Sequence, residues 1–212
     1  MVDALVAVLA AYLCGSLLFG VILSKWLKGV DIRSLDNPGG TGSIRKFGWR
    51  FGLMVGVLDA LKGVAATYLA HTLTGDPIVV MLSAMAVVAG HNWPIYFSFR
   101  GGGGLAPAFG VIIYHYPQEF ALGLIPALLM LALYKRTPIR RWLPFIGPVP
   151  IISVVGLLTT LAFVWQRYGF FPGSATIIAM GIPIAIGGYV MLLRDRRRRG
   201  VEEVEGRRSA TS

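Results

Sequence analysis

Long apolar runs alternate with short polar segments along the chain. We predict seven apolar spans, at residues 3–24, 51–72, 77–97, 104–116, 119–134, 143–165 and 174–193. A helix needs about 20 such residues to cross the hydrocarbon core of a bilayer. The fourth span has about 13 residues and would rise only about 20 Å, less than the ~30 Å core. The pattern predicts an all-α polytopic membrane protein of about seven transmembrane helices.

Composition agrees with a membrane protein. Hydrophobic residues make up 55% of the 212, the mean hydropathy is +0.67, and charged residues are only 14%, against roughly 25% in a soluble domain. The net charge of +10 does not indicate nucleic acid, because the basic residues fall between apolar spans instead of on one soluble face. The start "MVDALVAVLA" lacks a positive n-region, so we predict a retained helix and no cleaved signal peptide. Cys14 lies within this span and is expected to pack there.

The basic residues predict an orientation. Given seven spans, 18 of the 20 lysines and arginines fall on one side, the exceptions being Lys62 and Arg167. The positive-inside rule makes that side cytoplasmic. We therefore expect a multi-pass protein of the inner (cytoplasmic) membrane, with the N-terminus outside and the C-terminus in the cytoplasm.

The predicted organisation is a single transmembrane domain, residues 1–194, followed by a cytoplasmic tail, 195–212. The connections predicted on the outer side are short, so chemistry would use the cytoplasmic loops at 25–50 and 98–104, which are rich in glycine. The arginine run of the tail is expected to lie against anionic lipid headgroups.

The first cytoplasmic loop combines small residues, polar side chains and a cation. Its candidate ligand-binding residues are Ser34, Asn37, Gly39, Gly40, Thr41 and Arg45. Glycine backbones can form an anion-binding nest, and the guanidinium fork suits a phosphate. A flexible basic loop is the other interpretation, and the Gly-Lys-Ser/Thr of a Walker A motif is missing.

An acid and a base interrupt the second span. Asp59 and Lys62 are three residues apart, so on a helix they share a face and can pair. Charged residues within a bilayer usually face the interior of the helix bundle. Both a buried structural ion pair and a role in the site remain open.

The third span ends in "GHNWPIYFSFRGGGG", residues 90–104. His91 lies near the predicted cytoplasmic end, and Pro94 should loosen the last turns of the helix. Arg100 and the glycines Gly101, Gly102, Gly103 and Gly104 then form either a slack linker or a backbone that approaches a ligand. The chain shows no spacing of metal ligands and no Ser/His/Asp set, so we predict no metal and no cofactor. The two loops suit a phosphate-bearing small molecule or a lipid headgroup.

The motifs together resemble the PlsY-type acyl-phosphate:glycerol-3-phosphate acyltransferases. The similarity runs from "GSLLFG" (15–20) to "LLRDRRR" (192–198), with the intervening pieces in the family's order: "NPGGTGSIR" (37–45), "LDALKG" (58–63) and "GHNWPIYFSFRGGGG" (90–104). The resemblance implies a seven-span membrane enzyme of phospholipid biosynthesis. Its substrates would be an acyl phosphate and glycerol 3-phosphate, and its product lysophosphatidic acid. Membrane lipids would surround it, and no protein partner is indicated.

The resemblance also implies roles for individual residues. Arg45 and Arg100 would hold phosphates, the glycines Gly39, Gly40 and Gly101 to Gly104 would supply backbone donors, and His91 and Asn37 would position or polarise the substrate. Some positions depart from the family. Gly103 replaces an expected lysine, and Asp195 and Arg198 stand where the family carries a histidine and an asparagine.

Two other functions remain as alternatives. The departures would also fit a family paralogue with altered or lost catalysis that binds lipid phosphates or regulates a partner. A small transporter or channel would need polar residues on several spans, and only Asp59 and Lys62 fit.

Overall fold

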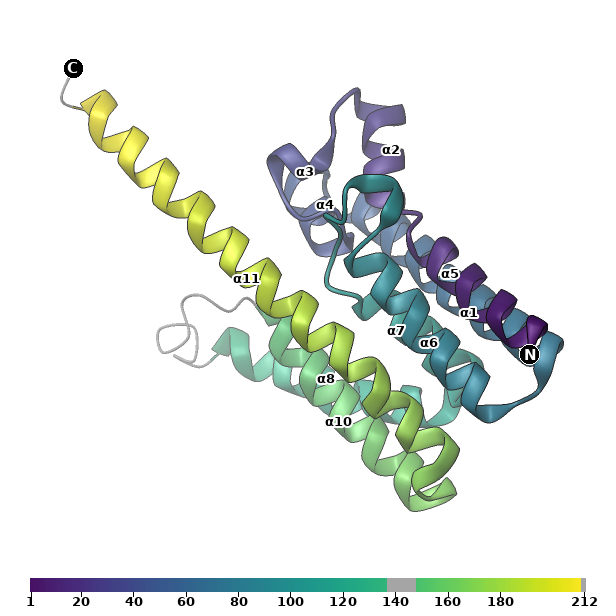
Figure 1. The fold of residues 1–212 in the computed structure, drawn as a ribbon. Coiled ribbons are helices and arrows are strands. Elements are labelled where there is room, and N and C mark those ends of the chain that lie inside the picture. The colour runs from purple at the N-terminus through teal and green to yellow at the C-terminus, as the bar shows by residue number, and fades with distance from the viewer. Residues whose placement is uncertain (137–147, 211–212) are drawn as a thin grey trace.

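The computed structural model describes the backbone of residues 1–136 and 148–210, and every regular element in these ranges is a helix. Figure 1 shows them as a bundle. In chain order the elements are α1 (Val2–Gly15), α2 (Phe19–Lys28), α3 (Ile32–Leu35), α4 (Gly40–Phe47), α5 (Trp49–Thr74), α6 (Pro77–Asn92), η1 (Ile95–Phe97), α7 (Leu105–His115), α8 (Pro117–Arg136), α10 (Pro148–Tyr168), η2 (Phe170–Ser174) and α11 (Ala175–Ala210).

Within residues 1–136 and 148–210, the predicted apolar spans are confirmed as helical segments. Six are long and apolar enough to cross a membrane: Val2–Lys28, Trp49–Thr74, Pro77–Phe97, Pro117–Tyr134, Ile151–Tyr168 and Phe170–Arg194. The fourth predicted span, α7, has only 11 residues, so it rises about 16 Å and falls short of a full crossing, as expected.

The first span is not the single helix that we predicted. It breaks between Gly15 and Phe19, and Leu18 there has an extended backbone (φ −87°, ψ 97°). A break inside a membrane leaves carbonyl groups that need partners. The carbonyl oxygens of Gly15 and Leu17 accept hydrogen bonds from Lys62 Nζ at 2.8 and 2.9 Å. A contact with α5 therefore stabilises the break, and local hydrophobicity could not reveal it.

The segment 25–50 is also more ordered than the predicted loop, since it holds the end of α2 together with α3 and α4. Helix α4 packs closely on the start of α5. A Cβ atom at Gly52 would lie 2.2 Å from Ile44 Cγ1 and 2.7 Å from the Gly40 carbonyl oxygen. This close approach fixes the direction of the "GGTG" turn (39–42), which begins α4.

Small residues dominate the centre of the bundle. The largest buried cluster includes Ala11, Ala66, Ala84, Val87, Ala108 and Val111, drawn from α1, α5, α6 and α7. Such side chains let helix backbones approach closely, which is how membrane helices pack.

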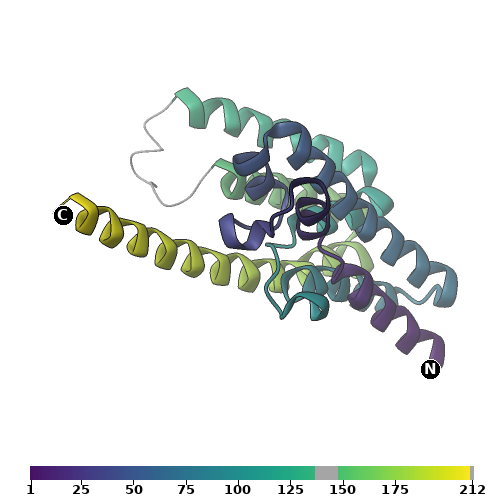
Figure 2. The same ribbon diagram turned by 90° about the horizontal axis from the view of Figure 1, so that it is seen from above.

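The two ends of the bundle differ. In Figures 1 and 2 the N-terminus lies at the end opposite α2, α3 and α4, and α11 continues well past the other helices. The segment predicted as a tail, 195–212, begins within this helix, which runs to Ala210. The side chains of Asp195 and residues 197–212, and most of the predicted basic loop 135–142, lie outside the described residues.

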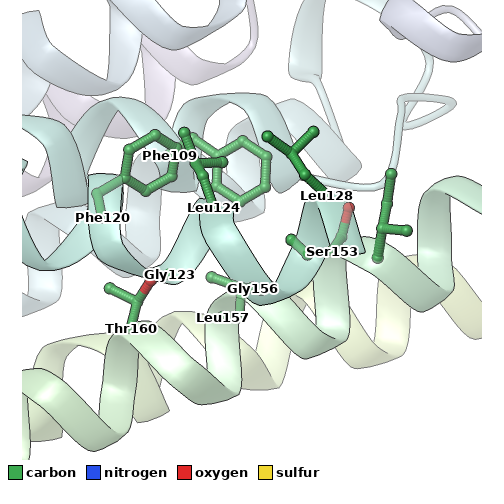
Figure 3. A pocket seen from close by; sticks show the side chains of 11 residues that line it. Phe109, Phe120, Gly123, Leu124, Leu128, Ser153, Gly156, Leu157 and Thr160 are labelled. Carbon is green, nitrogen blue, oxygen red and sulfur yellow. The ribbon is translucent and has the colours of Figure 1, made fainter. Parts of the chain in front are cut away.

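A small cavity of about 110 Å³ lies between α7, α8 and α10. Figure 3 shows mainly apolar side chains around it, including Phe109, Phe120 and Leu124. Among the described residues, no cationic side chain lines it. It is therefore unsuited to a phosphate, and the candidate site lies elsewhere.

Candidate functional site

The glycine run folds back onto the end of α6. That helix ends at Asn92, two residues before Pro94 and earlier than the predicted span 77–97, in the region where Pro94 was expected to loosen the last turns. The amide of Gly101 donates to the Asn92 carbonyl at 3.1 Å, and the amide of Gly102 donates to the His91 carbonyl at 3.0 Å. The run is thus an ordered turn, residues 98–104, which we call the glycine turn.

The amides of the turn fall into two pairs. Those of Gly101 and Gly102 cap the carbonyl end of α6, so they are already used within the chain. Within the described residues, the amides of Gly103 and Gly104 have no hydrogen-bond acceptor. Gly104 has a φ of +80° and immediately precedes α7, so the two open donors lie where the helix dipole favours negative charge.

A buried polar cluster supports the turn from beneath. Lys62 Nζ lies 3.0 Å from Asp59 Oδ1 and 2.8 Å from His91 Nδ1. Each of the three side chains is at most 3% exposed. The predicted pairing of Asp59 with Lys62 is therefore confirmed.

His91 is joined to this cluster instead of facing an open site. An ammonium beside Nδ1 makes that nitrogen an acceptor, so a neutral ring carries its proton on Nε2. The Nε2 atom faces Gly102, since a Cβ atom there would lie 2.4 Å from it. The ring therefore packs against the glycine turn.

Two more contacts tie this end of α6 to its neighbours. Tyr12 of α1 donates its hydroxyl to the Trp93 carbonyl at 2.6 Å. Asn92 Nδ2 donates to the carbonyl of Pro183 in α11 at 2.5 Å. The glycine turn is thus held from α1, α5 and α11, which favours a rigid backbone over a slack linker.

The first glycine-rich motif forms the start of α4. Gly39 is its N-cap, and the first turn contains Gly40, Thr41 and Gly42. The amides of a first turn have no partner within the helix and attract anions. The side-chain Nδ2 of Asn37, next to this turn, is buried without a hydrogen-bond partner among the described residues. The start of α4 is therefore rich in hydrogen-bond donors.

Arg45 lies on the same short helix and is held by Asp36. Arg45 Nη2 and Nε contact Asp36 Oδ1 and Oδ2 at 2.5 and 2.9 Å. Partial burial raises the pKa of Asp36, but the hydrogen bonds from Arg45 and the Asn37 amide, together with the charges of Arg45 and Lys46, outweigh burial and lower the pKa. The pair therefore stays charged at neutral pH, and the carboxylate fixes the direction of the Arg45 guanidinium.

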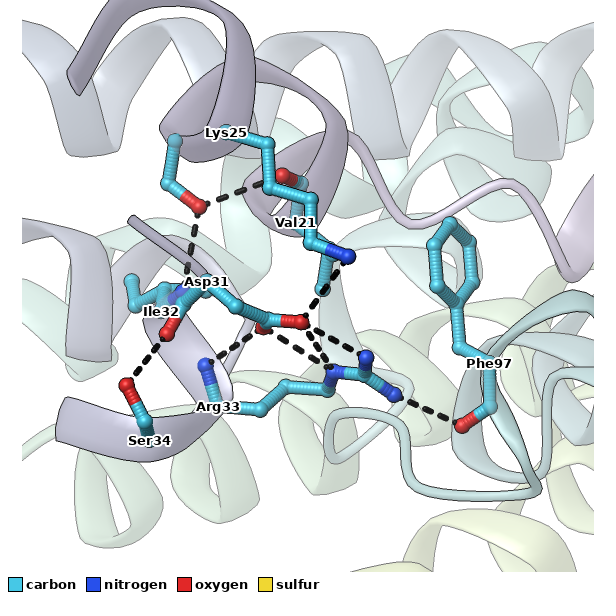
Figure 4. Close-up of polar contacts among 8 residues, drawn as sticks. Val21, Lys25, Asp31, Ile32, Arg33, Ser34 and Phe97 are labelled. Atoms are coloured by element: carbon cyan, nitrogen blue, oxygen red, sulfur yellow. Dashed lines mark hydrogen bonds and ion pairs between the residues drawn. The ribbon is translucent and has the colours of Figure 1, made fainter. Parts of the chain in front are cut away.

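A clip of charged side chains joins α3 to η1 (Figure 4). Arg33 binds both carboxylate oxygens of Asp31 and donates from Nη1 to the Phe97 carbonyl at 2.8 Å. Its guanidinium also lies 5.4 Å from the centre of the Phe97 ring. Lys25 adds a second cation, 3.2 Å from Asp31. The clip holds α3 against η1, which leads into the glycine turn.

The clip predicts a pH dependence of stability. Hydrogen bonds from Arg33 hold the pKa of Asp31 well below its ordinary value of 3.8. A carboxyl with a lowered pKa stabilises the fold above its ordinary value and loses that effect as the pH falls. We expect Asp31→Asn to cost about 1–3 kcal/mol at pH 7. In thermal unfolding, the difference in stability between Asp31→Asn and the wild type should persist at pH 5 and shrink below about pH 4.

Asp3→Asn is the matched control, because Asp3 is exposed at the start of α1. It should track the wild type at every pH. A gap for Asp31→Asn that widened in acid would contradict the assignment of Asp31 to the clip.

The structure thus sorts the predicted residues. Asn37, Gly39, Gly40 and Thr41 lie at the start of α4, Arg45 lies in the last turn of the same helix and reaches back to Asp36, and Arg100 is exposed on the glycine turn. Ser34 is exposed and donates its hydroxyl to the Asp31 carbonyl at 2.8 Å, so it faces the clip.

Sequence reasoning missed the residues that hold the site in place: Asp31, Arg33, Asp36 and Asn92. The one local signal was Asp31 two residues before Arg33, a helix-capping pattern.

Comparison with known proteins gives this arrangement a context. The family model described as "Glycerol-3-phosphate acyltransferase" matches residues 5–195. "Glycerol-3-phosphate acyltransferase 2" of Deinococcus radiodurans is 37% identical over 177 residues, 81% of this chain and 88% of the relative. The similar protein of Desulforamulus reducens is 36% identical over 177 residues, 82% of this chain and 84% of the relative.

A solved structure is also similar. It is the crystal structure of PlsY (YgiH), an integral membrane glycerol 3-phosphate acyltransferase, in the glycerol 3-phosphate form. The match has a TM-score of 0.65 at 30% identity and covers 96% of this chain and 93% of that one.

Proposed function

Because the chain belongs to the glycerol-3-phosphate acyltransferase family, we propose that it transfers a fatty acyl group from acyl phosphate to the 1-hydroxyl of glycerol 3-phosphate. The protein is a multi-pass membrane protein, and the reaction would take place at the cytoplasmic face of the inner membrane. The basic segments and both glycine motifs would lie on that side, with the N-terminus outside.

The chemistry needs no group beyond the two substrates. The oxygen of the 1-hydroxyl forms a bond to the acyl carbon, and the bond between that carbon and the phosphate oxygen breaks. The hydroxyl proton leaves with the phosphate. Acyl phosphate is an activated mixed anhydride, so the task of the protein is to bind two phosphates, align the reacting atoms and stabilise developing negative charge.

The two motifs divide this task. Arg45, Asn37 and the first turn of α4 would bind one phosphate, and Arg100 with the open amides of Gly103 and Gly104 the other. Gly101, Gly102 and His91 would hold the turn in shape. His91 would then be a positioning residue, because its ring is buried against Lys62 and Gly102.

An apolar groove is available for the acyl chain. It has a volume of about 370 Å³ and is lined by α1, α6 and α11. Trp93, directly after the last residue of α6, lies at its edge, and Val8, Leu82 and Ile186 are among its walls. Its position beside the end of α6 would let an acyl chain leave the phosphate site along the helices.

The donor-rich glycine turn, fixed from three helices beside Arg100, is the observation that carries this proposal. The test supplies purified protein with acyl phosphate and labelled glycerol 3-phosphate and measures lysophosphatidate. Product above a no-protein control is expected. If a family enzyme is active in the same assay and this protein is not, an altered paralogue replaces the proposal.

Asp36 offers a prediction for the phosphate site. Asp36→Asn should raise the KM for glycerol 3-phosphate about 5-fold, equivalent to about 1 kcal/mol, because Arg45 loses the carboxylate that orients it. Thermal stability should change little, since the pair is partly exposed. Steady-state kinetics on Asp36→Asn and Asp3→Asn would check this. An unchanged KM would remove the orienting role.

A further inference from the structure

Helix α11 approaches the glycine turn along one face. Pro183 accepts a hydrogen bond from Asn92, and a Cβ atom at Gly187 would lie 2.3 Å from Asn92 Nδ2. One turn further, Met191 is the neighbour of Gly103, whose Cβ position would be 3.7 Å from Met191 Sδ and Cε. The contact positions 183, 187 and 191 repeat every four residues, which is one side of a helix.

The next position on that side carries a cation. Arg194 follows Met191 by three residues, so it projects from the same side one turn beyond Gly103. Its side chain is exposed. The glycine turn carries a second exposed cation, Arg100, three residues before Gly103. Among the side chains that the structure describes, no carboxylate lies within ion-pair distance of Arg100 or Arg194.

The same place holds further unused polar groups. The amides of Gly103 and Gly104 are open, and α7 begins directly after them. Asn92 Oδ1 is buried, has no hydrogen-bond partner among the described residues, and lies 2.8 Å from the Cβ position of Gly104. An acceptor beside two cations and two N–H donors fits a ligand that carries both a phosphate and a hydroxyl group.

We propose that Arg194 of α11 and Arg100 of the glycine turn, with the amides of Gly103 and Gly104, form a subsite for the phosphate group of a substrate. A dianion between two guanidinium groups removes their repulsion and forms charge-assisted hydrogen bonds. Arg194, on the last helix, thereby supplies a positive charge that Gly103 cannot supply. This inference rests on the proposed function for the identity of the substrate.

The first test measures binding without catalysis. The full-length protein in zwitterionic nanodiscs is titrated with inorganic phosphate and with glycerol 3-phosphate while thermal stability is followed. Ligand should raise the thermal stability of the wild type. Arg194→Gln should need an at least 10-fold higher concentration of one of the two ligands for the same stabilisation. Arg50→Gln is the matched control, since Arg50 is an exposed cation that stacks on Trp49. Its titration should match the wild type.

Kinetics then distinguish the source of the phosphate. Arg194→Gln should raise the KM of either acyl phosphate or glycerol 3-phosphate at least 10-fold and leave the other within about twofold. The Cβ atom of a lysine at position 103 has room, because among the described residues only Met191 lies within 4 Å of that position and the φ of Gly103 is not positive. The double variant Arg194→Gln/Gly103→Lys should regain much of the lost affinity.

The subsite would be overturned if neither ligand stabilised the wild type, or if Arg194→Gln and Arg50→Gln gave equal titrations. It would also be overturned if Arg194→Gln differed from the wild type only in nanodiscs that contain anionic lipid. The last would assign Arg194 to lipid headgroups. Ligand binding that depends on Arg194 in a protein without transferase activity would retain the subsite and reject the proposed function.

Discussion

Replacing Lys62 by methionine is expected to destabilise the protein by about 3–5 kcal/mol, because it leaves the buried Asp59 without its counter-charge. The same change removes the donor to the Gly15 and Leu17 carbonyls at the break of the first span, and the hydrogen bond to His91. One ammonium thus supports α1, α5 and α6 together. We expect most of the variant to be lost from the monodisperse peak in size-exclusion chromatography after mild heating in detergent.

A double variant separates the charge from the hydrogen bonds. Lys62→Met/Asp59→Asn removes both charges, so it should recover part of the stability lost by Lys62→Met alone. Lys28→Met is the control, since Lys28 is exposed at the end of α2, and it should behave as the wild type. If the double variant were no more stable than Lys62→Met, the uncompensated carboxylate would not be the cause.

Replacing Gly101 by alanine should lower kcat/KM at least 100-fold, equivalent to about 2.7 kcal/mol. The added Cβ atom would lie 2.0 Å from the His91 carbonyl oxygen and 2.7 Å from that of Asn92. Those two oxygens accept the bonds that form the glycine turn, so relieving the clash breaks the turn. Steady-state kinetics with both substrates would measure the loss.

Gly188→Ala is the matched control for this substitution. Gly188 lies in α11, and nothing lies within 4 Å of its Cβ position. The variant should keep its activity and gain slightly in stability, because alanine is the better helix former. Activity of Gly101→Ala within about threefold of the wild type would show that transfer does not depend on the shape of the turn.

Features that depend on residues close together along the chain could be predicted from the sequence. The spans follow from runs of apolar residues, the end of α6 from Pro94, and the Asp59–Lys62 pair from a spacing of three on one helix. The break after Gly15 was missed because "GSLLFG" is apolar apart from Ser16 and continues the apolar run, and the partner that permits the break belongs to α5.

The candidate site shows the same division. Both glycine motifs and the cations Arg45 and Arg100 could be found in the sequence as suitable groups. The sequence could not show which amides lack an acceptor, because Gly101 and Gly102 donate to carbonyls nine and eleven residues upstream. The clip likewise depends on a bond between Arg33 and Phe97, 64 residues apart.

By itself, then, the sequence determined that this is a helical membrane protein with two donor-rich motifs, since hydrophobicity, charge and local spacing are properties of near neighbours. Only the tertiary structure decided that His91 packs on Lys62, 29 residues away, and that Asn92 reaches α11, 91 residues away. Such contacts follow from how the helices pack, which no local pattern records. That packing ties the glycine turn to its neighbours and brings Met191 of α11 beside Gly103.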